Sequence, residues 1–110
     1  KETTFDIASC GMIGLESCFG AVNKVLCKEN NMKFEKLINL LTVNPRKIMG
    51  FKRDLFSIGS SAEVAVLDCS KEWKFTLKDI QSKSVNSPFI GKMLQGKVLH
   101  TISKNFIASI

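Results

Sequence analysis

Few side chains in this 110-residue chain could do chemistry. The single histidine, His100, lies in the alternating stretch 98–102 with no carboxylate near it in sequence, which is typical of a structural or solvent-facing histidine. Asp54, Asp68 and Asp79 are isolated, and no two carboxylates are spaced to share a helix face as an acid–base pair. The side chains alone therefore predict no catalytic residue in this chain.

The four cysteines could indicate disulfides or a zinc site. No two of them form a C-x-x-C pair, whereas zinc ribbons and fingers need closely spaced pairs of ligands; they are Cys10, Cys18, Cys27 and Cys69. Cys18 lies among apolar residues at helical spacing, which favours a buried free thiol. Reduced cysteines are typical of a cytoplasmic protein, so we expect no disulfide and no bound metal in this chain.

Length and charge exclude further classes. A chain of this length can form one compact domain but not a complete (β/α)₈ barrel, which needs about 250 residues. The net charge of +6 comes from scattered cations, and the densest cluster, 47–53, lacks a set of aromatic side chains on which bases could stack. We therefore expect a solvated basic surface and no nucleic-acid partner.

No membrane partner is expected either, because no apolar run approaches the roughly 18 residues of a transmembrane helix. The opening sequence KETTFD is polar and has no initiator methionine, which indicates the middle of a longer protein rather than a signal peptide.

The first half of the chain has helical periodicity after a loop over residues 1–14. One apolar stripe predicts a helix over Leu15–Lys28 that ends at two asparagines; the stripe consists of Leu15, Cys18, Phe19, Val22, Val25 and Leu26. A second helix is predicted over Phe34–Leu41. Asn44 and Pro45 are expected to interrupt it, with Asn44 as a cap, before one further turn that stops at Gly50.

After Gly50 the period changes from helical to alternating, which predicts strands. Four strands are expected, and Gln81–Pro88 is expected to be a polar loop; the strands are Glu63–Asp68, Trp73–Leu77, Gly96–Ile102 and Phe106–Ile110. Trp73, Phe75 and Leu77 should share one face. Lys104–Asn105 can form the tight turn of a hairpin between the last two strands. The fold class is therefore α+β.

Four stretches, in order, carry motifs of one enzyme family. They are FDIASCGMIGLES at 5–17, LTVNPRKIMG at 41–50, GSSAEVAVLD at 59–68, and SK followed by NSPFIG, LQGKV and TI within 82–102. They resemble the substrate loop F-x-x-A-P-x-G-I-x-G-L-E-T, the motif T-x-N-P-A-K-I-L-G, the return strand G-x-x-A-D-L-V-L-x-D and the closing signature of the dihydroorotases. The departures are mild: Ser9, Ser17, Arg46 and Glu63 stand for Pro, Thr, Ala and Asp.

This resemblance implies the C-terminal part of a metal-dependent cyclic amidohydrolase. Residues 1–50 would be the substrate loop and the last helices of a TIM barrel, with Leu15–Lys28 the last barrel helix and Phe34–Leu41 the helix that leads out. Residues 51–110, from about Asp54 onward, would be the C-terminal portion of a small β-sandwich. The intact enzyme would interconvert N-carbamoyl-aspartate and dihydroorotate in pyrimidine biosynthesis by metal-assisted hydrolysis and condensation of the ring amide.

The resemblance also implies which groups lie elsewhere. The family binds two divalent metal ions, usually zinc, through an H-x-H motif, a carboxylated lysine, two further histidines and an aspartate, all of which would precede Lys1. The chain by itself should therefore bind no metal and be inactive. Its contribution would be the backbone of Cys10 and Gly11, whose counterparts hold the substrate. The alternative for Gly11 is a glycine that only turns the chain into the helix.

Other readings remain open. Hydantoinases and dihydropyrimidinases resemble G-x-E-D-R after the loop glycine, whereas this chain has Glu16-Ser17-Cys18, and allantoinases tend to carry Tyr where Phe89 stands. The alternatives are an allantoinase-like amidohydrolase and a non-catalytic β-sandwich interaction module.

The apolar stripe of the first helix also predicts a partner. Without barrel strands its six side chains would forgo on the order of 10 kcal/mol of burial. We therefore expect a homodimer or a swapped oligomer that covers the stripe, with Cys10 and Cys27 close to the interface.

Overall fold

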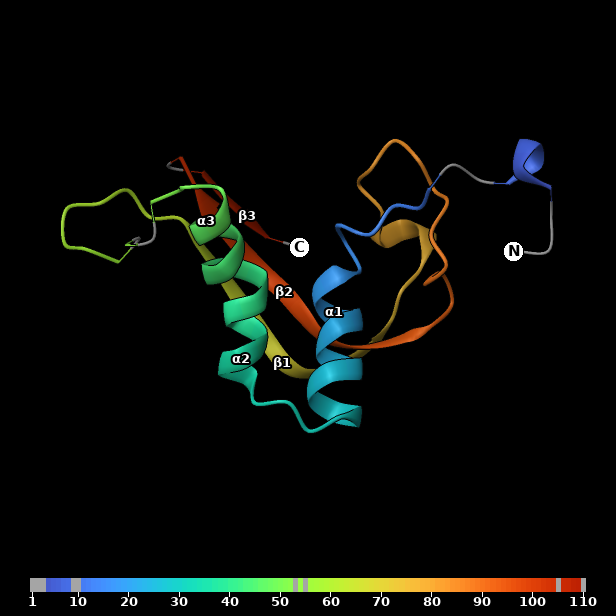
Figure 1. The fold of residues 1–110 in the computed structure, drawn as a ribbon, viewed down its shortest axis with the longest axis horizontal. Coiled ribbons are helices and arrows are strands. Elements are labelled where there is room, and N and C mark those ends of the chain that lie inside the picture. The colour runs from blue at the N-terminus through green and yellow to red at the C-terminus, as the bar shows by residue number, and fades with distance from the viewer. Residues whose placement is uncertain (1–3, 9–10, 53, 55, 105, 110) are drawn as a thin grey trace.

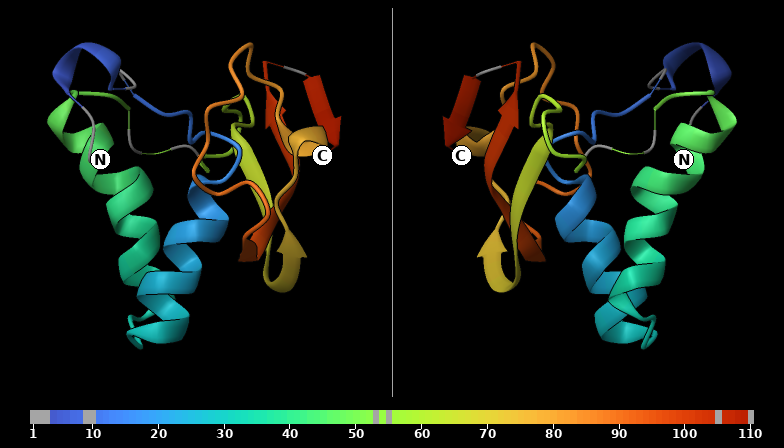
Figure 2. Two further views of the ribbon diagram at one scale, coloured as in Figure 1. Left: turned by 90° about the vertical axis from the view of Figure 1, so that its right-hand side faces the viewer. Right: turned by 90° about the vertical axis from the view of Figure 1, so that its left-hand side faces the viewer.

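The computed structural model describes residues 4–8, 11–52, 54, 56–104 and 106–109. It contains two helical rods and an antiparallel sheet, so the predicted α+β class is confirmed. A single 3₁₀ turn, Phe5–Ile7, precedes them, and a second, η4 (Leu77–Asp79), follows the first strand. Both rods lie on the same side of the sheet: the first rod packs against the strand β2 (Met93–Ser103), and the second packs against the first (Figures 1 and 2). None of the helices in the described ranges has the length and apolarity to cross a membrane.

The first rod is close to the prediction. It consists of α1 (Cys18–Val22), which continues directly into the π-helical segment η2 (Asn23–Glu29), and it starts three residues later than predicted because residues 15–17 form a turn. Asn31, at φ 56°, lies in the link to the next helix.

The second rod is longer than predicted. It consists of α2 (Phe34–Ile38), the π-helical segment η3 (Asn39–Val43) and α3 (Asn44–Ile48), without a break. The prediction that Asn44 caps a separate turn is wrong, because Asn44 has helical φ and ψ angles and the residue before it is helical as well. The wider π-helical turn immediately before Pro45 gives the proline ring room, which is otherwise crowded against the preceding turn.

The predicted stop at Gly50 is confirmed. Gly50 has φ +69°, its N–H donates to the carbonyl of Lys47, and the N–H of Phe51 donates to the carbonyl of Arg46. This pair of bonds is the Schellman arrangement, in which a residue with positive φ satisfies the last carbonyls of a helix.

The sheet has three strands in the order β1-β2-β3, not four. They are β1 (Val64–Lys74), β2 (Met93–Ser103) and β3 (Phe106–Ser109). The two stretches predicted at Glu63–Asp68 and Trp73–Leu77 are largely one strand, since β1 pairs with β2 on both sides of an irregularity between Asp68 and Glu72. The polar loop at Gln81–Pro88 is confirmed, because it contains no helix or strand.

The prediction that Trp73, Phe75 and Leu77 share one face of a strand is partly wrong. Phe75 is buried and lies edge-to-face against Trp73, with 5.8 Å between the ring centroids. Leu77, however, starts η4 and is 59% exposed, because the chain leaves the sheet after Lys74. The hairpin between β2 and β3 is confirmed: Ser103 pairs with Phe106, and Lys104 has φ +50°. Asn105 and Ile110 lie outside the described residues.

The irregularity in β1 is built by Asp68. Its Oδ1 accepts hydrogen bonds from the N–H and hydroxyl of Ser70, at 3.0 and 2.8 Å, and from the N–H of Lys71 at 3.1 Å. Three donors on one carboxylate oxygen hold this segment out of the regular ladder, as in a β-bulge. They also lower the pKa of Asp68, with the Ser70 hydroxyl as the main cause.

The bulge leaves the carbonyl of Cys69 free to bind Asn23, the first residue of η2. The side chain of Asn23 is buried, and its Nδ2 donates to the carbonyls of Cys69 at 3.1 Å and Gln95 at 2.9 Å. One amide group thus joins the first rod to two neighbouring strands. A buried amide satisfied in this way fixes the position of the helix, because an unsatisfied one is costly.

Two glycines, one in α1 and one in β2, allow the helix to lie close to the strand. A Cβ on Gly20 would lie 2.9 Å from the carbonyl oxygen of Gly96, and a Cβ on Gly96 would lie 2.8 Å from the ring of Phe19. Gly96 also has φ +95°, a conformation that side chains with a Cβ rarely adopt. Helix and strand therefore pack almost backbone to backbone at this point.

This packing corrects the prediction for the apolar stripe. The buried residues at this contact are Ser17, just before α1, and Gly20 and Asn23 in the first rod; they are spaced by three and do not belong to the apolar stripe. The stripe is divided between two environments. Phe19, Val22 and Leu26 are half-buried within the chain, whereas Leu15, Cys18 and Val25 are exposed. The prediction of a buried Cys18 thiol is therefore wrong.

The interior is small for the length of the chain. Among the described residues only three large apolar side chains are buried, namely those of Leu37, Phe75 and Leu94. The radius of gyration is 16.2 Å, against about 13 Å for a compact domain of 110 residues. Nineteen large apolar side chains in the described part of the chain are exposed, including Leu15, Ile48 and Phe106 at 80% or more.

Substitution of the glycine at the helix–sheet contact should be more costly than substitution of a glycine in a loop. Gly59 also has positive φ, +85°, but a Cβ there would meet nothing within 4 Å. We expect Gly59→Ala to cost about 1–2 kcal/mol through backbone strain and Gly96→Ala about 1–3 kcal/mol more through crowding. Urea unfolding followed by the fluorescence of Trp73 measures both. Equal losses would show that the contact is not crowded.

Candidate functional site

The segment 11–16, which belongs to the predicted substrate loop, lies beside the loop 81–88 (Figure 1). Cys10 lies outside the described residues, so the structure places only Gly11 of the two predicted site residues. Gly11 is exposed, and a Cβ there would meet nothing within 4 Å. Among the residues that the structure describes, no atom would crowd a Cβ at this position, and the Gly11 backbone is open to a ligand or to another part of the protein.

Asn86 fixes this backbone from the opposite loop. Its side-chain Nδ2 donates to the carbonyl oxygen of Gly11 at 2.6 Å, and its main-chain carbonyl accepts the N–H of Ile13 at 3.2 Å. The hydroxyl of Ser84 donates to Oδ1 of Asn86 at 2.5 Å and so orients the amide. Seventy-five residues separate Asn86 from Gly11 in the sequence.

Glu16 makes the second connection between the two loops. Its Oε1 accepts hydrogen bonds from the N–H of Gln81 at 3.1 Å, from the N–H of Ser82 at 2.8 Å and from the Ser82 hydroxyl at 2.7 Å. These bonds lower the pKa of Glu16 to about 2, and the bond from the Ser82 hydroxyl is the largest cause. The other oxygen, Oε2, is buried and bonds to none of the described residues.

A cleft of about 560 Å³ lies between the first rod and the sheet. Its lining is mainly apolar and includes Glu16, Phe19, Trp73 and Lys97. The Nζ of Lys97 lies 5.0 Å from the centre of the Trp73 ring, and the indole N–H donates to the carbonyl of Gly96 at 2.9 Å. The indole is thereby held in place as one wall of the cleft.

Asp79, Asp54 and His100 bond to neighbouring residues of the fold. Asp79 accepts hydrogen bonds from the N–H and hydroxyl of Thr76 and closes the capping box of η4. Asp54 bonds to the Ser57 hydroxyl, which lowers its pKa. His100 is exposed, as its alternating strand predicted, and lies 3.0 Å from the Ser109 hydroxyl. Within the described residues, no three His, Cys, Asp or Glu side chains come together to hold a metal.

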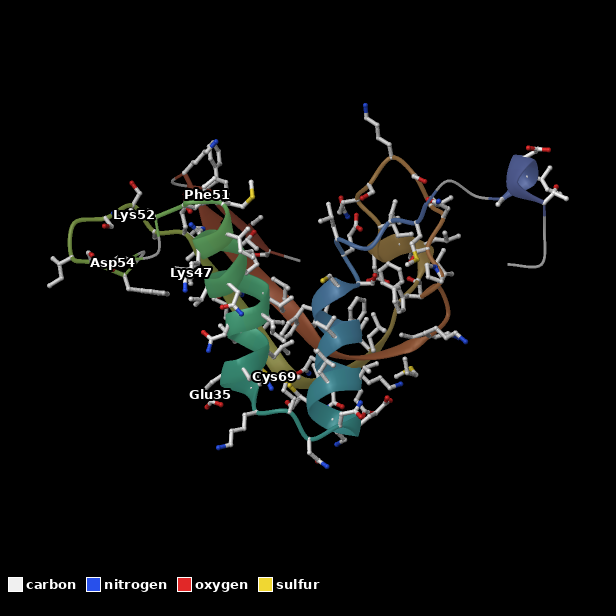
Figure 3. All side chains as sticks on the ribbon, viewed as in Figure 1. Glu35, Lys47, Phe51, Lys52, Asp54 and Cys69 are labelled. Atoms are coloured by element: carbon white, nitrogen blue, oxygen red, sulfur yellow. The ribbon has the colours of Figure 1, made fainter. Side chains whose placement is uncertain are left out.

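Two cysteines share a second, smaller cavity of about 260 Å³. Cys27 and Cys69 both line it, and both are half-buried and free; Figure 3 labels Cys69 low in the view, between the two rods. Burial, followed by the nearby carboxylate of Asp68, raises the pKa of the Cys69 thiol. A thiol with a raised pKa is a poor nucleophile.

The basic cluster 47–53 lies away from the loops that contain Gly11 and Asn86. Figure 3 shows Lys47, Phe51 and Lys52 around the end of α3 and the segment that follows it. Lys52 bonds to the Ser60 hydroxyl at 3.3 Å, and Arg46 forms an ion pair with Glu63 at 3.5 Å. These side chains thus contact residues of their own segment.

The sequence motifs contain Glu16, Ser82 and Asn86, but the sequence alone assigned them no role. The structure joins Glu16 to Ser82 and Asn86 to Gly11, each across more than 60 residues. Their presence in the first and last motifs of the chain was the available signal, but spacing alone does not say which of them meet.

The lowered pKa of Glu16 predicts a stability change in acid. Its pKa is about 2 in the folded chain against 4.5 for an ordinary glutamate, so the unfolded chain binds the proton more readily. The stabilisation is therefore complete above pH 4.5 and is lost as the pH falls towards about 2. Glu16→Gln should flatten this part of the stability–pH curve, measured by urea unfolding.

The matched control is Glu35→Gln, which removes an exposed carboxylate from α2. Because Asp54 and Asp68 also have lowered pKa values, the curve of every variant will slope in acid, and only the difference from the unmodified chain counts. If Glu16→Gln and Glu35→Gln change the slope equally, the bonds to Gln81 and Ser82 do not stabilise the fold.

The chain is similar to several curated dihydroorotases. No family model matches the chain. It is 42% identical over 101 residues to a dihydroorotase of Elusimicrobium minutum, which covers 92% of this chain and 23% of that protein. It is 35% identical over 104 residues to a dihydroorotase of Geobacter sp. strain M21, a match that covers 94% of this chain and 24% of that protein. It is 36% identical over 98 residues to a dihydroorotase of Caldicellulosiruptor saccharolyticus, which covers 89% of this chain and 23% of that protein. The resemblance to the dihydroorotases is therefore confirmed, and this chain corresponds to about a quarter of the length of the curated relatives that it matches.

Proposed function

We propose that this chain is the C-terminal part of a dihydroorotase, an enzyme that interconverts N-carbamoyl-aspartate and dihydroorotate in the cytoplasm for pyrimidine biosynthesis. The observation that carries the proposal is the match to dihydroorotases over 92% of the chain, which includes the 11–16 segment. In this proposal the backbone of Cys10 and Gly11 holds the substrate. The exposed position of Gly11 supports it, because a planar ring can lie against a backbone that has no Cβ.

The proposed architecture assigns residues 1–50 to the end of a TIM barrel and 51–110 to the C-terminal portion of a β-sandwich. Two features of the chain support it. The long strand β1 and the short strand β3 are the edges of the sheet, and edge strands of this length are normally paired or covered. The exposed apolar side chains along the second rod, such as Leu40, Val43 and Ile48, supply a face that further elements could cover.

The metal centre belongs to the rest of the protein in this proposal. Since no group of three candidate ligands occurs among the residues that the structure describes, the ions, proposed to be zinc, would be bound by side chains outside this chain. Two divalent ions in the intact enzyme would supply Lewis acidity for the ring-amide chemistry. This chain's own part is to present the backbone at Gly11 and to hold it in place.

The test is an assay of the whole protein that carries this segment. It should hydrolyse dihydroorotate, lose this activity on treatment with a chelator and recover it with zinc. The 110-residue chain alone should show no activity with or without added zinc. Activity on allantoin but not dihydroorotate would assign the protein to a related amidohydrolase, and activity on neither would favour an interaction module.

The isolated chain should also self-associate. Leu15, Cys18 and Val25 of the predicted stripe are exposed, and further apolar side chains are exposed on the second rod. Exposed apolar patches of this kind favour association, so sedimentation at micromolar concentration should detect dimers or larger species. A matched variant with Leu15→Ser and Val25→Ser should shift the distribution towards monomer. A monomeric unmodified chain at this concentration would contradict the expectation of a homodimer or swapped oligomer.

A further inference from the structure

We infer that the 81–88 loop positions the substrate-binding backbone, with Asn86 as the residue that sets the place of Gly11. This inference rests on the proposed function, because it assigns a role to Asn86 in presenting the backbone that would hold dihydroorotate. Asn86 is a positioning residue here: it bonds to the carbonyl of Gly11 and to the N–H of Ile13, not to a substrate.

The 11–16 segment has little else to hold it. Gly11 and Met12 are exposed, Leu15 is 88% exposed, and only the residues that follow enter the helix. Ile13 is the one large apolar side chain of this segment that is half-buried, so side-chain packing holds this backbone only weakly. The hydrogen bonds from the 81–88 loop are its main connections to the rest of the described chain.

These bonds hold the segment at two separate points. At one end Asn86 bonds to Gly11 and Ile13, and at the other Glu16 accepts three hydrogen bonds from Gln81 and Ser82. The bonds to the carboxylate are charge-assisted and hence stronger than neutral ones. Because Glu16 is fixed, the part of the segment that can still move is the end at Gly11, and Asn86 is the residue that restricts this movement.

The amide of Asn86 is suited to this role. The side-chain Nδ2 of Asn86 bonds to the carbonyl of Gly11, and its main-chain carbonyl accepts the N–H of Ile13. The residue thus holds main-chain groups on either side of Met12, whose N–H bonds to none of the described residues. The Ser84 hydroxyl, bonded to Oδ1, orients Nδ2 towards Gly11. An aspartate would have the same shape but would place an oxygen against the Gly11 carbonyl, so the donor and not the volume is what matters.

The test uses Asn86→Ala and Asn86→Asp in the whole protein that carries this segment. Both should raise KM for dihydroorotate about tenfold or more, as expected for the loss of one hydrogen bond, with kcat changed less than about threefold. The amide of Ile13 should also exchange its hydrogen about tenfold faster, because without the side-chain bond to Gly11 this end of the segment is held to the 81–88 loop only by the main-chain bond between Ile13 and residue 86. Val85→Ala, an exposed side chain in the same loop, is the matched control and should leave all three quantities unchanged.

Ser84→Ala keeps the inference testable if the Asn86 variants do not fold, because it removes only the hydroxyl that orients the amide. It should raise KM by a smaller factor in the same direction. Unchanged KM in the folded variants would overturn the inference, whether or not the exchange of Ile13 changes. A whole protein without dihydroorotase activity would instead refute the proposed function, and the positioning role would fall with it.

Discussion

The close contact between the first rod and strand β2 is the constraint on which the rest of this structure depends. Gly20 and Gly96 remove the side chains that would keep the two backbones apart. Asn23 then reaches the carbonyls of Cys69 and Gln95, one on each of two neighbouring strands. The carbonyl of Cys69 is available because Asp68 holds that part of β1 out of the ladder. Small residues, a buried amide and a bulge therefore act together to fix the helix on the sheet.

The same contact brings the two loops of the candidate site together. Glu16 lies two residues before α1, so the position of the helix determines where its carboxylate lies. The link from β1 to β2 contains Ser82 and Asn86, so the position of the sheet determines where these residues lie. Once helix and sheet are joined, Glu16 can accept its three hydrogen bonds and Asn86 can reach Gly11. The exposed backbone at Gly11 is thus positioned from the interior of the fold outwards.

Local patterns predicted the local features, whereas long-range contacts escaped them. The two helices, the stop at Gly50 and the hairpin at Lys104 follow from periodicity and turn chemistry within a few residues. The single bent strand was missed because its bulge depends on the Asp68 side chain. The buried helix face was missed because a run of Ser17, Gly20 and Asn23 has no apolar signal. For the candidate site, Cys10 and Gly11 came from family resemblance alone, and no spacing rule could pair Asn86 with a glycine 75 residues away.

The most direct test is a crystal structure of the whole protein with dihydroorotate bound. We expect the ligand to lie within hydrogen-bond distance of the backbone at Gly11, with the Asn86 amide still donating to the Gly11 carbonyl. Glu16 should keep its bonds to the 81–88 loop. A ligand bound away from the 11–16 segment, or an 81–88 loop that no longer contacts this segment, would contradict the positioning role of this loop.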